Sequence, residues 1–416
     1  MTISEKKDYL TGRLNNKDVL VRLEALSELK KMIDDKLIDA PQAGEDVNNH
    51  IHTTYSFSPY SPTKAVWMAY NAGLKTAGIM DHDSLSGARE FIKAAEIVGM
   101  LSTIGTECRA SMKNTPLADK RINNPDQKGI AYMALHGVPH QNIDAVIDFF
   151  RPYSLKRAER NRRMTANINS LISHVGITLD YDRDVVPLSN SLLGGSVTER
   201  HLLYALSGKI TARFGKGQAV VDFLEKDLGI PLSAKVRAFL SDPDNDVYEY
   251  DLLGALKSNM VEKFYVDADE ECPDVKDIIR LGREIGAISA YAYLGDVGDS
   301  VTGDKKAQKF EDSYIDLLFD TIKELGFNAV TYMPSRNSAE QLRTVRSMCD
   351  RYGLFQISGE DINSPRQKFI CEAQRAPEFS NLHDATLRLI RHEQEATADI
   401  TKAMFYVPGV TCDRIV

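Results

Sequence analysis

The chain has 416 residues, more than one average domain needs and fewer than three, so we expect two domains or one large barrel with an insertion. Its 51 basic and 59 acidic side chains give a net charge of -8, which argues against long nucleic acids but leaves a small anionic substrate open. The 43% hydrophobic and 26% charged residues exclude disorder over most of the length, and no apolar run approaches the roughly 20 residues of a membrane span.

The cysteines and the N-terminus indicate the cellular compartment. The five cysteines show no CxxC spacing, so we expect neither a disulfide framework nor a thiolate zinc cluster; they are Cys108, Cys272, Cys349, Cys371 and Cys412. Residues 1–31 form a charged helical pattern and not a secretory signal. We therefore expect a cytoplasmic protein without membrane contact, and the sequence leaves its oligomeric state open.

The N-terminal stretch predicts one helix over residues 5–35. Every third residue from Leu20 to Met32 is apolar, amid many charged side chains. A loop with Pro41 and Gly44 ends this helix.

From Val47 onward, short apolar runs alternate with helical patterns. Strands are expected in a run ending at His52 and over 77–80, 101–104 and 130–135, with helices from about residues 63 and 84. Such β-α alternation is typical of a parallel sheet or barrel.

The alternation stops between residues 140 and 261, where long amphipathic patterns predict an all-helical insertion. It resumes with helices over 274–285, 310–325 and 338–352, strands over 287–293, 329–333 and 354–357, and a last helix over 381–404. We therefore predict an N-terminal helical extension (1–45), a barrel in two parts (46–140 and 262–375), the insertion (141–261) and a C-terminal helical segment (376–416).

The strongest local chemical signal is Asn49-His50-Ile51-His52-Thr53. Residues two apart on a strand project to the same face, so both imidazoles can reach one metal ion. Alone, the pair is better explained as two polar residues at the end of a strand than as metal ligands.

Further polar residues follow the other predicted strands. They are Asp81-His82-Asp83, Gly105-Thr106-Glu107, His136 and Gly359-Glu360-Asp361. Functional groups collect at the carboxyl ends of strands in such sheets and barrels, which makes coincidence improbable. His140 is expected to be a structural histidine.

Imidazoles and carboxylates without thiolates suit zinc, manganese or iron at an open, hydrolytic site. Two or more ions sharing a bridging glutamate would polarise a phosphoryl oxygen and generate a hydroxide nucleophile.

Together these motifs resemble the PHP (polymerase and histidinol phosphatase) family of metal-dependent phosphoesterases. The matching pieces are His50-Ile51-His52-Thr53-Thr54-Tyr55-Ser56, Asp81-His82-Asp83, Gly105-Thr106-Glu107, His136 and Gly359-Glu360-Asp361, in the family's order. The resemblance implies an α/β fold, a distorted (β/α)7 barrel with up to three metal ions, here interrupted by the all-helical insertion.

The resemblance also implies a role for each residue. The first metal would be held by His50, His52, Glu107 and Asp361. Glu107 would bridge to a second metal that also uses His136, and His82 would serve a third. Asp81 and His82 are the residues expected to take part in catalysis.

Three positions depart from the family's pattern. Phe57 stands where the family has an Asp, Tyr293 replaces a histidine ligand in Ala292-Tyr293-Leu294-Gly295, and Asn363 replaces the last histidine. Asp296 or Asp83 are candidate substitutes. We therefore predict one firmly held divalent transition metal ion, or two, instead of three.

The insertion resembles that of a branch of the family similar to nucleoside-monophosphate phosphatases. Its predicted substrate-binding residues are Arg160, Arg163, Arg200 and His201. Arg157, Arg160 and Arg163 are three apart and would share a helix face, where guanidinium groups could grip a phosphate. For Arg157 and Arg162, a solvated basic face explains the pattern equally well.

The function implied is hydrolysis of a small phosphorylated metabolite, above all a nucleotide monoester, by a metal-bound hydroxide. Two alternatives stay open: an exonuclease acting on short oligonucleotides, and a binding or regulatory module whose metal centre has partly decayed. The replacement of ligands at Phe57, Tyr293 and Asn363 favours the binding or regulatory module. The complete set of ligands for the first metal favours catalysis.

Overall fold

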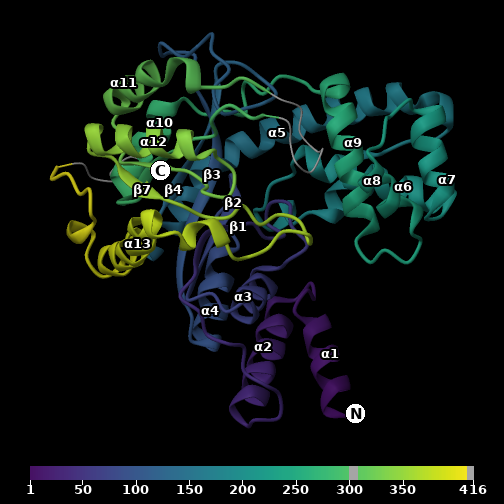
Figure 1. The fold of residues 1–416 in the computed structure, drawn as a ribbon, viewed down its shortest axis with the longest axis horizontal. Helices are drawn as coiled ribbons and strands as arrows, with labels where there is room; N and C mark the ends of the chain where they lie inside the picture. The colour runs from purple at the N-terminus through teal and green to yellow at the C-terminus, as the bar shows by residue number, and fades with distance from the viewer. Residues whose placement is uncertain (299–307, 410–416) are drawn as a thin grey trace.

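The computed structural model describes residues 1–298 and 308–409, and Cys412 lies outside them. The fold is of the α/β class: helices surround one curled sheet of seven strands in the order β1 to β7 (Figure 1). The strands are β1 (Val47–Ile51), β2 (Thr76–His82), β3 (Leu101–Ser111), β4 (Ile130–His136), β5 (Ile288–Ala292), β6 (Ala329–Thr331) and β7 (Phe355–Ile357).

The sheet is mixed and not fully parallel. Strands β1 to β3 run parallel to one another, as do β5 to β7, but β4 is antiparallel to both β3 and β5. The predicted regular alternation is wrong at this place. The segment 112–129 between β3 and β4 contains no helix, so the chain returns beside β3 without the crossover that a parallel strand requires.

The curl of the sheet brings the segment after β7 back to β1. The His52 amide donates to the Ile362 carbonyl at 2.9 Å, and the Ile362 amide donates to the His50 carbonyl at 3.1 Å. Asn49 adds a side-chain bond to the carbonyl of Ser358 at 2.8 Å. Two strand ends that are about 300 residues apart in sequence therefore lie side by side.

The helices that contribute to the core around the sheet include α3 (Pro62–Asn71), α4 (Ala88–Val98), α10 (Val275–Ile285), α11 (Ile315–Leu325), α12 (Ala339–Tyr352) and α13 (Ser380–Ala398). Capping residues fix the ends of these helices, as α10 illustrates. Asp274 caps α10 by accepting from the Lys276 amide, and Gly286 ends it in the left-handed region at φ 75°.

The N-terminal stretch forms two helices, α1 (Ile3–Arg13) and α2 (Val19–Asp34), where one was predicted. Asp18 caps α2 by accepting from the Leu20 amide, which breaks the helix between residues 13 and 19. Leu20 itself is 68% exposed, so the apolar stripe begins only after it. A buried ion pair between Arg22 and Glu90 ties α2 to α4.

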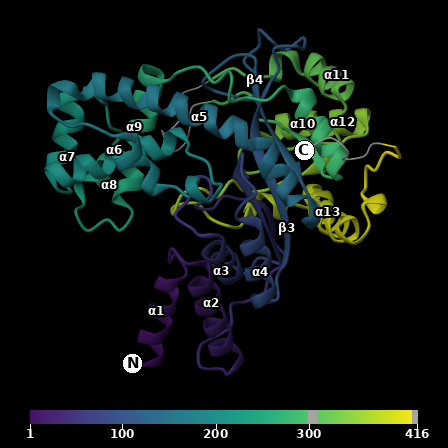
Figure 2. The same cartoon turned by 180° about the vertical axis from the view of Figure 1, so that it is seen from behind.

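A second group of helices projects from one side of the sheet (Figures 1 and 2). It contains α5 (Ile143–Ile172), α6 (Glu199–Phe214), α7 (Gln218–Asp222), α8 (Ala234–Ser241) and α9 (Tyr248–Phe264), which we call the helical unit. These helices share a hydrophobic core, and Phe57 is the one residue from the first barrel segment within that core.

Helix α5 belongs to both parts of the molecule. Its first half, with Val146 and Phe150, packs into the core around the sheet, and its second half, with Met164 and Ile168, packs into the helical unit. The boundary predicted at 140/141 thus lies just before the start of α5. The residues of α5 that belong to the core of the helical unit come after Pro152.

Helix α13 packs against β7, β3 and β1. Its Glu393 accepts from the Thr103 hydroxyl at 2.6 Å and from the Ile104 amide at 2.9 Å. Glu393 also pairs with His140 at 2.9 Å, which agrees with a structural role for that histidine. Among the described residues, no helix is both long and apolar enough to cross a bilayer.

Candidate metal centre

Three predicted ligands from two strands meet inside the curled sheet. His50 belongs to β1, His52 follows it directly, and Glu107 belongs to β3. The Glu107 Oε2 atom lies 3.6 Å from His50 Nε2 and 4.0 Å from His52 Nε2. Ligand atoms held about 2.1 Å from one ion lie roughly 3.0–3.5 Å apart, so a small adjustment would let all three bind the same ion.

Asp361 joins this cluster from the segment after β7. Its Oδ1 atom lies 3.2 Å from His52 Nε2. The same oxygen accepts a hydrogen bond of 2.6 Å from the Asn363 amide nitrogen. Asn363 therefore holds Asp361 in place through its side-chain amide.

His82 lies on the other side of Glu107. Its Nδ1 atom is 3.2 Å from Glu107 Oε2, and its ring stacks on that of His52 with centroids 4.6 Å apart. Glu107 is thus central to the cluster, as its predicted bridging role requires.

The charges of the cluster are strongly coupled. Burial alone would raise the pKa of Glu107, but the neighbouring histidines, His50 first, lower it to about 2. Burial also opposes ionisation of Asp361, yet His52 and His50 hold its pKa well below the usual range. Both carboxylates are therefore ionised and suited to a divalent cation.

His136 lies at the end of β4, opposite Gly105 on β3. It is 1% exposed, and neither ring nitrogen has a hydrogen-bond partner. Burial, with a smaller contribution from His50, lowers its pKa to about 3, so the ring is neutral. A buried neutral imidazole with both nitrogens unsatisfied fits the donor set of a metal centre.

Asp81, which was predicted to take part in catalysis together with His82, does not join the cluster. Alternation along β2 points it away from His82, and it accepts bonds of 2.6 Å from the Thr53 amide and hydroxyl and the Ser56 hydroxyl. The Ser56 hydroxyl lies 3.2 Å from His52 Nδ1. Asp81 therefore supports His52 from behind.

The other two departures from the family's pattern point elsewhere. Phe57 packs in the helical unit, with its ring centroid 4.9 Å from that of His201. The Tyr293 hydroxyl donates to Asp312 at 2.6 Å. The suggested substitutes are also engaged: Asp83 pairs with Arg157, and Asp296 accepts from the Phe310 amide at 2.7 Å. No replacement ligand is present at these positions.

The arginines of α5 are not arranged as predicted. Arg160 is 2% exposed and pairs with Glu199 at 2.8 Å and Glu271 at 3.0 Å, so it cannot grip a substrate. Arg157 is likewise buried. Arg162 pairs on the surface with Asp182, and Arg163 is exposed. The spacing of the arginines correctly predicted a helix. It could not show that Arg160 pairs with Glu199 and Glu271, which are distant in sequence.

Arg200 and His201 lie in the first turn of α6 and differ in their environment. His201 is buried, and its Nδ1 accepts from the Thr198 amide at 3.0 Å, which makes it part of a helix cap. The Arg200 guanidinium lies 5.5 Å from the centroid of the Phe57 ring, and its charge contributes to the low pKa of Asp361.

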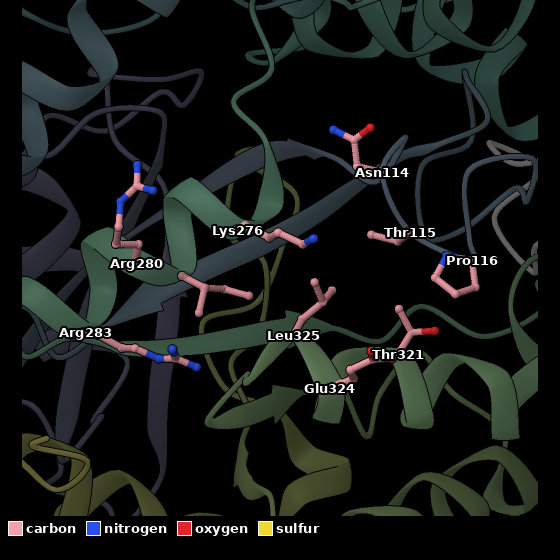
Figure 3. A pocket seen from close by; sticks show the side chains of 10 residues that line it. Asn114, Thr115, Pro116, Lys276, Arg280, Arg283, Thr321, Glu324 and Leu325 are labelled. Atoms are coloured by element: carbon pink, nitrogen blue, oxygen red, sulfur yellow. The ribbon is translucent and has the colours of Figure 1, made fainter.

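A hollow of about 370 Å³ lies elsewhere, between α10, α11 and the segment after β3 (Figure 3). It is lined by Thr115, Lys276, Arg283 and Leu325, among others. None of its lining residues belongs to the histidine cluster.

Sequence reasoning assigned no role to Arg109, Glu199 and Glu271, which the structure joins by ion pairs. Arg109 lies two residues after Glu107 on β3, so strand alternation could have placed it on the same face. It pairs with Glu199 at 2.9 Å and Glu271 at 3.2 Å. No local pattern marks Glu271, whereas Glu199 directly precedes the predicted residue Arg200 in sequence.

Residues 48–227 match the model of a family described as PHP domain. A candidate metal-dependent phosphoesterase from Bifidobacterium adolescentis has a similar structure, with a TM-score of 0.53, 17% identity, and coverage of 85% of this chain and 97% of that one. An amidohydrolase from Chromobacterium violaceum, solved with bound sulfate and no metal, is also similar in structure. Its TM-score is 0.50 and its sequence identity 16%, and the match covers 79% of this chain and 90% of that one. No curated protein sequence matches the chain. At these identities, the likeness shows a shared fold.

Proposed function

This chain carries a domain of the PHP family, as its motifs predicted, and from that premise we propose that it is a metal-dependent phosphoesterase. Its substrate would be a small phosphorylated metabolite, specifically a nucleotide monoester. The observation that carries the proposal is the convergence of His50, His52 and Glu107 from two strands, with donor atoms within 4.8 Å of one another.

His50, His52, Glu107 and Asp361 would hold one divalent ion, with zinc, manganese or iron as the candidates. An ion bound there supplies Lewis acidity, which polarises a phosphoryl oxygen and acidifies water. A second ion would share Glu107 and use His136. The missing ligands at Phe57 and Tyr293 support the expectation of one firmly held ion.

The protein's own residues would orient the substrate. Arg200, which lies in the first turn of α6 with its guanidinium 5.5 Å from the centroid of the Phe57 ring, would bind the phosphate by charge-assisted hydrogen bonds. His82, 25% exposed in its side chain and 3.2 Å from Glu107, is placed to exchange a proton at Nδ1 or to bind the ion itself. Its pKa is lowered to about 3, chiefly by burial, so it would begin the reaction as a neutral ring.

A binding or regulatory module is the second candidate. It is favoured by the fate of three ligand positions: Phe57 packs into the helical unit, Tyr293 bonds to Asp312, and Asn363 bonds to Asp361. Such a module would bind a phosphorylated ligand without releasing phosphate.

Phosphate release from a panel of nucleotides and sugar phosphates, with manganese or zinc added, separates the two candidates. We expect metal-dependent release from at least one nucleotide and about a thousandfold slower release by His52→Ala, because losing a ligand removes the ion. Thr54→Ala, which alters a neighbouring residue outside the cluster, is the control. Absence of release with every metal would reject the phosphoesterase, and full activity of His52→Ala would reject the ligand assignment.

A further inference from the structure

The hollow between α10, α11 and the segment after β3 has the size of a ligand site. Its volume is about 370 Å³, and small-molecule sites in proteins occupy about 300–1,000 Å³. Ile279 and Leu325 contribute apolar surface to its lining, whereas Asn114 and Thr321 contribute polar atoms. Apolar surface with a few polar groups is typical of sites that bind a small organic molecule.

Basic side chains dominate the charge of this hollow. Lys276, Arg280 and Arg283 line it from α10, and their spacing of four and three residues places them on one face of the helix. Arg280 is partly neutralised by Asp277, at 2.7 Å. Within the described part of the chain, Lys276 and Arg283 form no salt bridge. Two positive charges at the hollow are therefore free to meet an anion.

The end of α11 fixes the position of Arg283. The Arg283 Nη2 atom donates to the Gly326 carbonyl at 3.4 Å. Gly326 ends α11 in the left-handed region at φ 87°, and a methyl group on it would overlap the Arg283 guanidinium. The glycine thus lets the guanidinium lie against the backbone of α11. A guanidinium has five N–H donors, so others remain for a ligand.

Lys276 reaches the hollow from the other end of α10. Figure 3 shows its side chain extending from the helix towards Thr115 and Leu325, whereas Arg280 points away from them. Lys276 and Arg283 are seven residues apart, which corresponds to about 10 Å along a helix. Because both side chains are long, they can converge on one anionic group between them.

Acceptor groups in the hollow favour a ligand that also carries hydroxyls. Glu324 lines the hollow from α11 and forms no salt bridge with any described residue. The Asn114 side chain donates to Asp274 at 2.8 Å, which leaves its amide oxygen as an acceptor. A carboxylate accepts hydrogen bonds from hydroxyl groups but repels a bare anion. The lining therefore suits a molecule with an anionic end and a hydroxylated body.

We propose that this hollow binds a small phosphorylated sugar, with Lys276 and Arg283 on the phosphate and Glu324 accepting a hydrogen bond from a hydroxyl. A phosphate monoester carries a charge of about −1.5 to −2 at neutral pH, which the two cations balance. None of the lining residues belongs to the histidine cluster, so the site is separate from the metal centre. The inference does not depend on the proposed function.

The test measures binding of ribose 5-phosphate to the chelator-treated protein by calorimetry, with ribose as the uncharged control. We expect a dissociation constant of about 1 mM or lower for ribose 5-phosphate and no binding of ribose. Lys276→Ala and Arg283→Ala should each weaken binding about ten- to a hundredfold, because each removes a charge-assisted hydrogen bond.

Three further variants locate the ligand. Arg343→Ala removes an exposed arginine of α12 outside the hollow and should leave the affinity unchanged. His52→Ala alters the metal cluster and should also leave it unchanged. Glu324→Ala should narrow the difference in affinity between ribose 5-phosphate and inorganic phosphate, because it removes a hydroxyl acceptor and a charge that repels the free anion. Thermal unfolding checks that each variant is folded.

Several results would overturn the inference. They are absence of ribose 5-phosphate binding by the wild type, equal affinities in the wild type, Lys276→Ala and Arg283→Ala, and equal binding of ribose. Loss of binding in His52→Ala would overturn it as well, since the ligand would then lie at the metal cluster. The measurements need neither metal nor turnover, so a protein that hydrolyses no phosphate ester would still test this site.

Discussion

The ring of His52 is oriented by a residue that cannot itself reach the metal cluster. Ser56 lies 3.2 Å from His52 Nδ1 and donates to Asp81 at 2.6 Å. Partners of this kind fix the tautomer and direction of a ligating imidazole. Asp81 therefore acts on His52 through Ser56, although its own side chain points away from His82.

Ser56→Ala should therefore weaken metal binding about ten- to a hundredfold while leaving every ligand in place. Ser58→Ala is the matched control, since Ser58 is also buried and its hydroxyl accepts a hydrogen bond from the Tyr60 amide at 3.4 Å. Calorimetric titration with manganese measures both affinities. Equal affinities in the two variants would show that His52 needs no such support.

His136 gives the metal-free protein a pH dependence. Its folded pKa of about 3 lies below the ordinary value of 6.5, so the unfolded chain binds the proton more tightly. The stability contributed by the neutral ring is complete above pH 6.5 and is lost progressively as the pH falls from 6.5 towards 3.

Between pH 7 and pH 5 this loss is on the order of 2 kcal/mol. His136→Gln should flatten the pH dependence of the free energy of unfolding by that amount, as measured with urea in the presence of a chelator. His174→Gln, at an exposed histidine, is the control. Identical pH profiles for the wild type and His136→Gln would contradict a buried neutral His136.

Single residues also show where sequence reasoning ends. His50, His52, Glu107 and Asp361 were predicted from their motifs, and the structure brings them together. Arg160 was predicted as a phosphate ligand because helical spacing is visible in sequence. Its partners are not, because Glu271 lies 111 residues away from it.

Among the elements, the closure between β1 and the segment after β7 positions the cluster. Gly359 lies in this segment, and a methyl group on it would stand 2.6 Å from the His50 Cβ atom and 2.7 Å from its backbone nitrogen. Only a residue without a side chain allows the two backbones to approach so closely.

Gly359→Ala should displace His50 or Asp361, with a loss of about 1–3 kcal/mol in stability and at least a tenfold loss in manganese affinity. Gly208→Ala in α6 is the control, because nothing lies within 4 Å of its added methyl group. That control should gain up to about 1 kcal/mol in the helix. Urea unfolding and calorimetry measure the two quantities, and an unaffected Gly359→Ala variant would refute the tight closure.

The order of helices and strands was largely predictable, but direction and breaks were not. The alternation correctly placed the strands, yet β4 runs antiparallel because the segment before it forms no crossover helix. One N-terminal helix was predicted over residues 5–35 because the apolar spacing gives no sign of a break. In the structure Asp18 caps a second helix, which begins at Val19. In both cases the segment that connects two elements, and not the hydrophobic pattern, determined the structure.

At the scale of the whole molecule, the two largest hydrophobic cores among the described residues are joined by α5 and by the buried ion pairs of Glu271 with Arg109, Arg157 and Arg160. Because three arginines depend on Glu271, we expect both cores to unfold in one cooperative transition. Glu271→Gln leaves buried positive charge unbalanced, which should cost about 3–5 kcal/mol and split the calorimetric transition into two. One undivided transition in that variant would mean that α5 alone couples the cores.

The account depends on one metal ion bound by His50, His52 and Glu107, with Asp361 beside them. Calorimetric titration of the chelator-treated protein with manganese tests this claim most directly. We predict one tight site per chain in the wild type and its loss in Glu107→Gln, where the central carboxylate is removed. Absence of tight binding in the wild type, or equally tight binding in Glu107→Gln, would contradict the account.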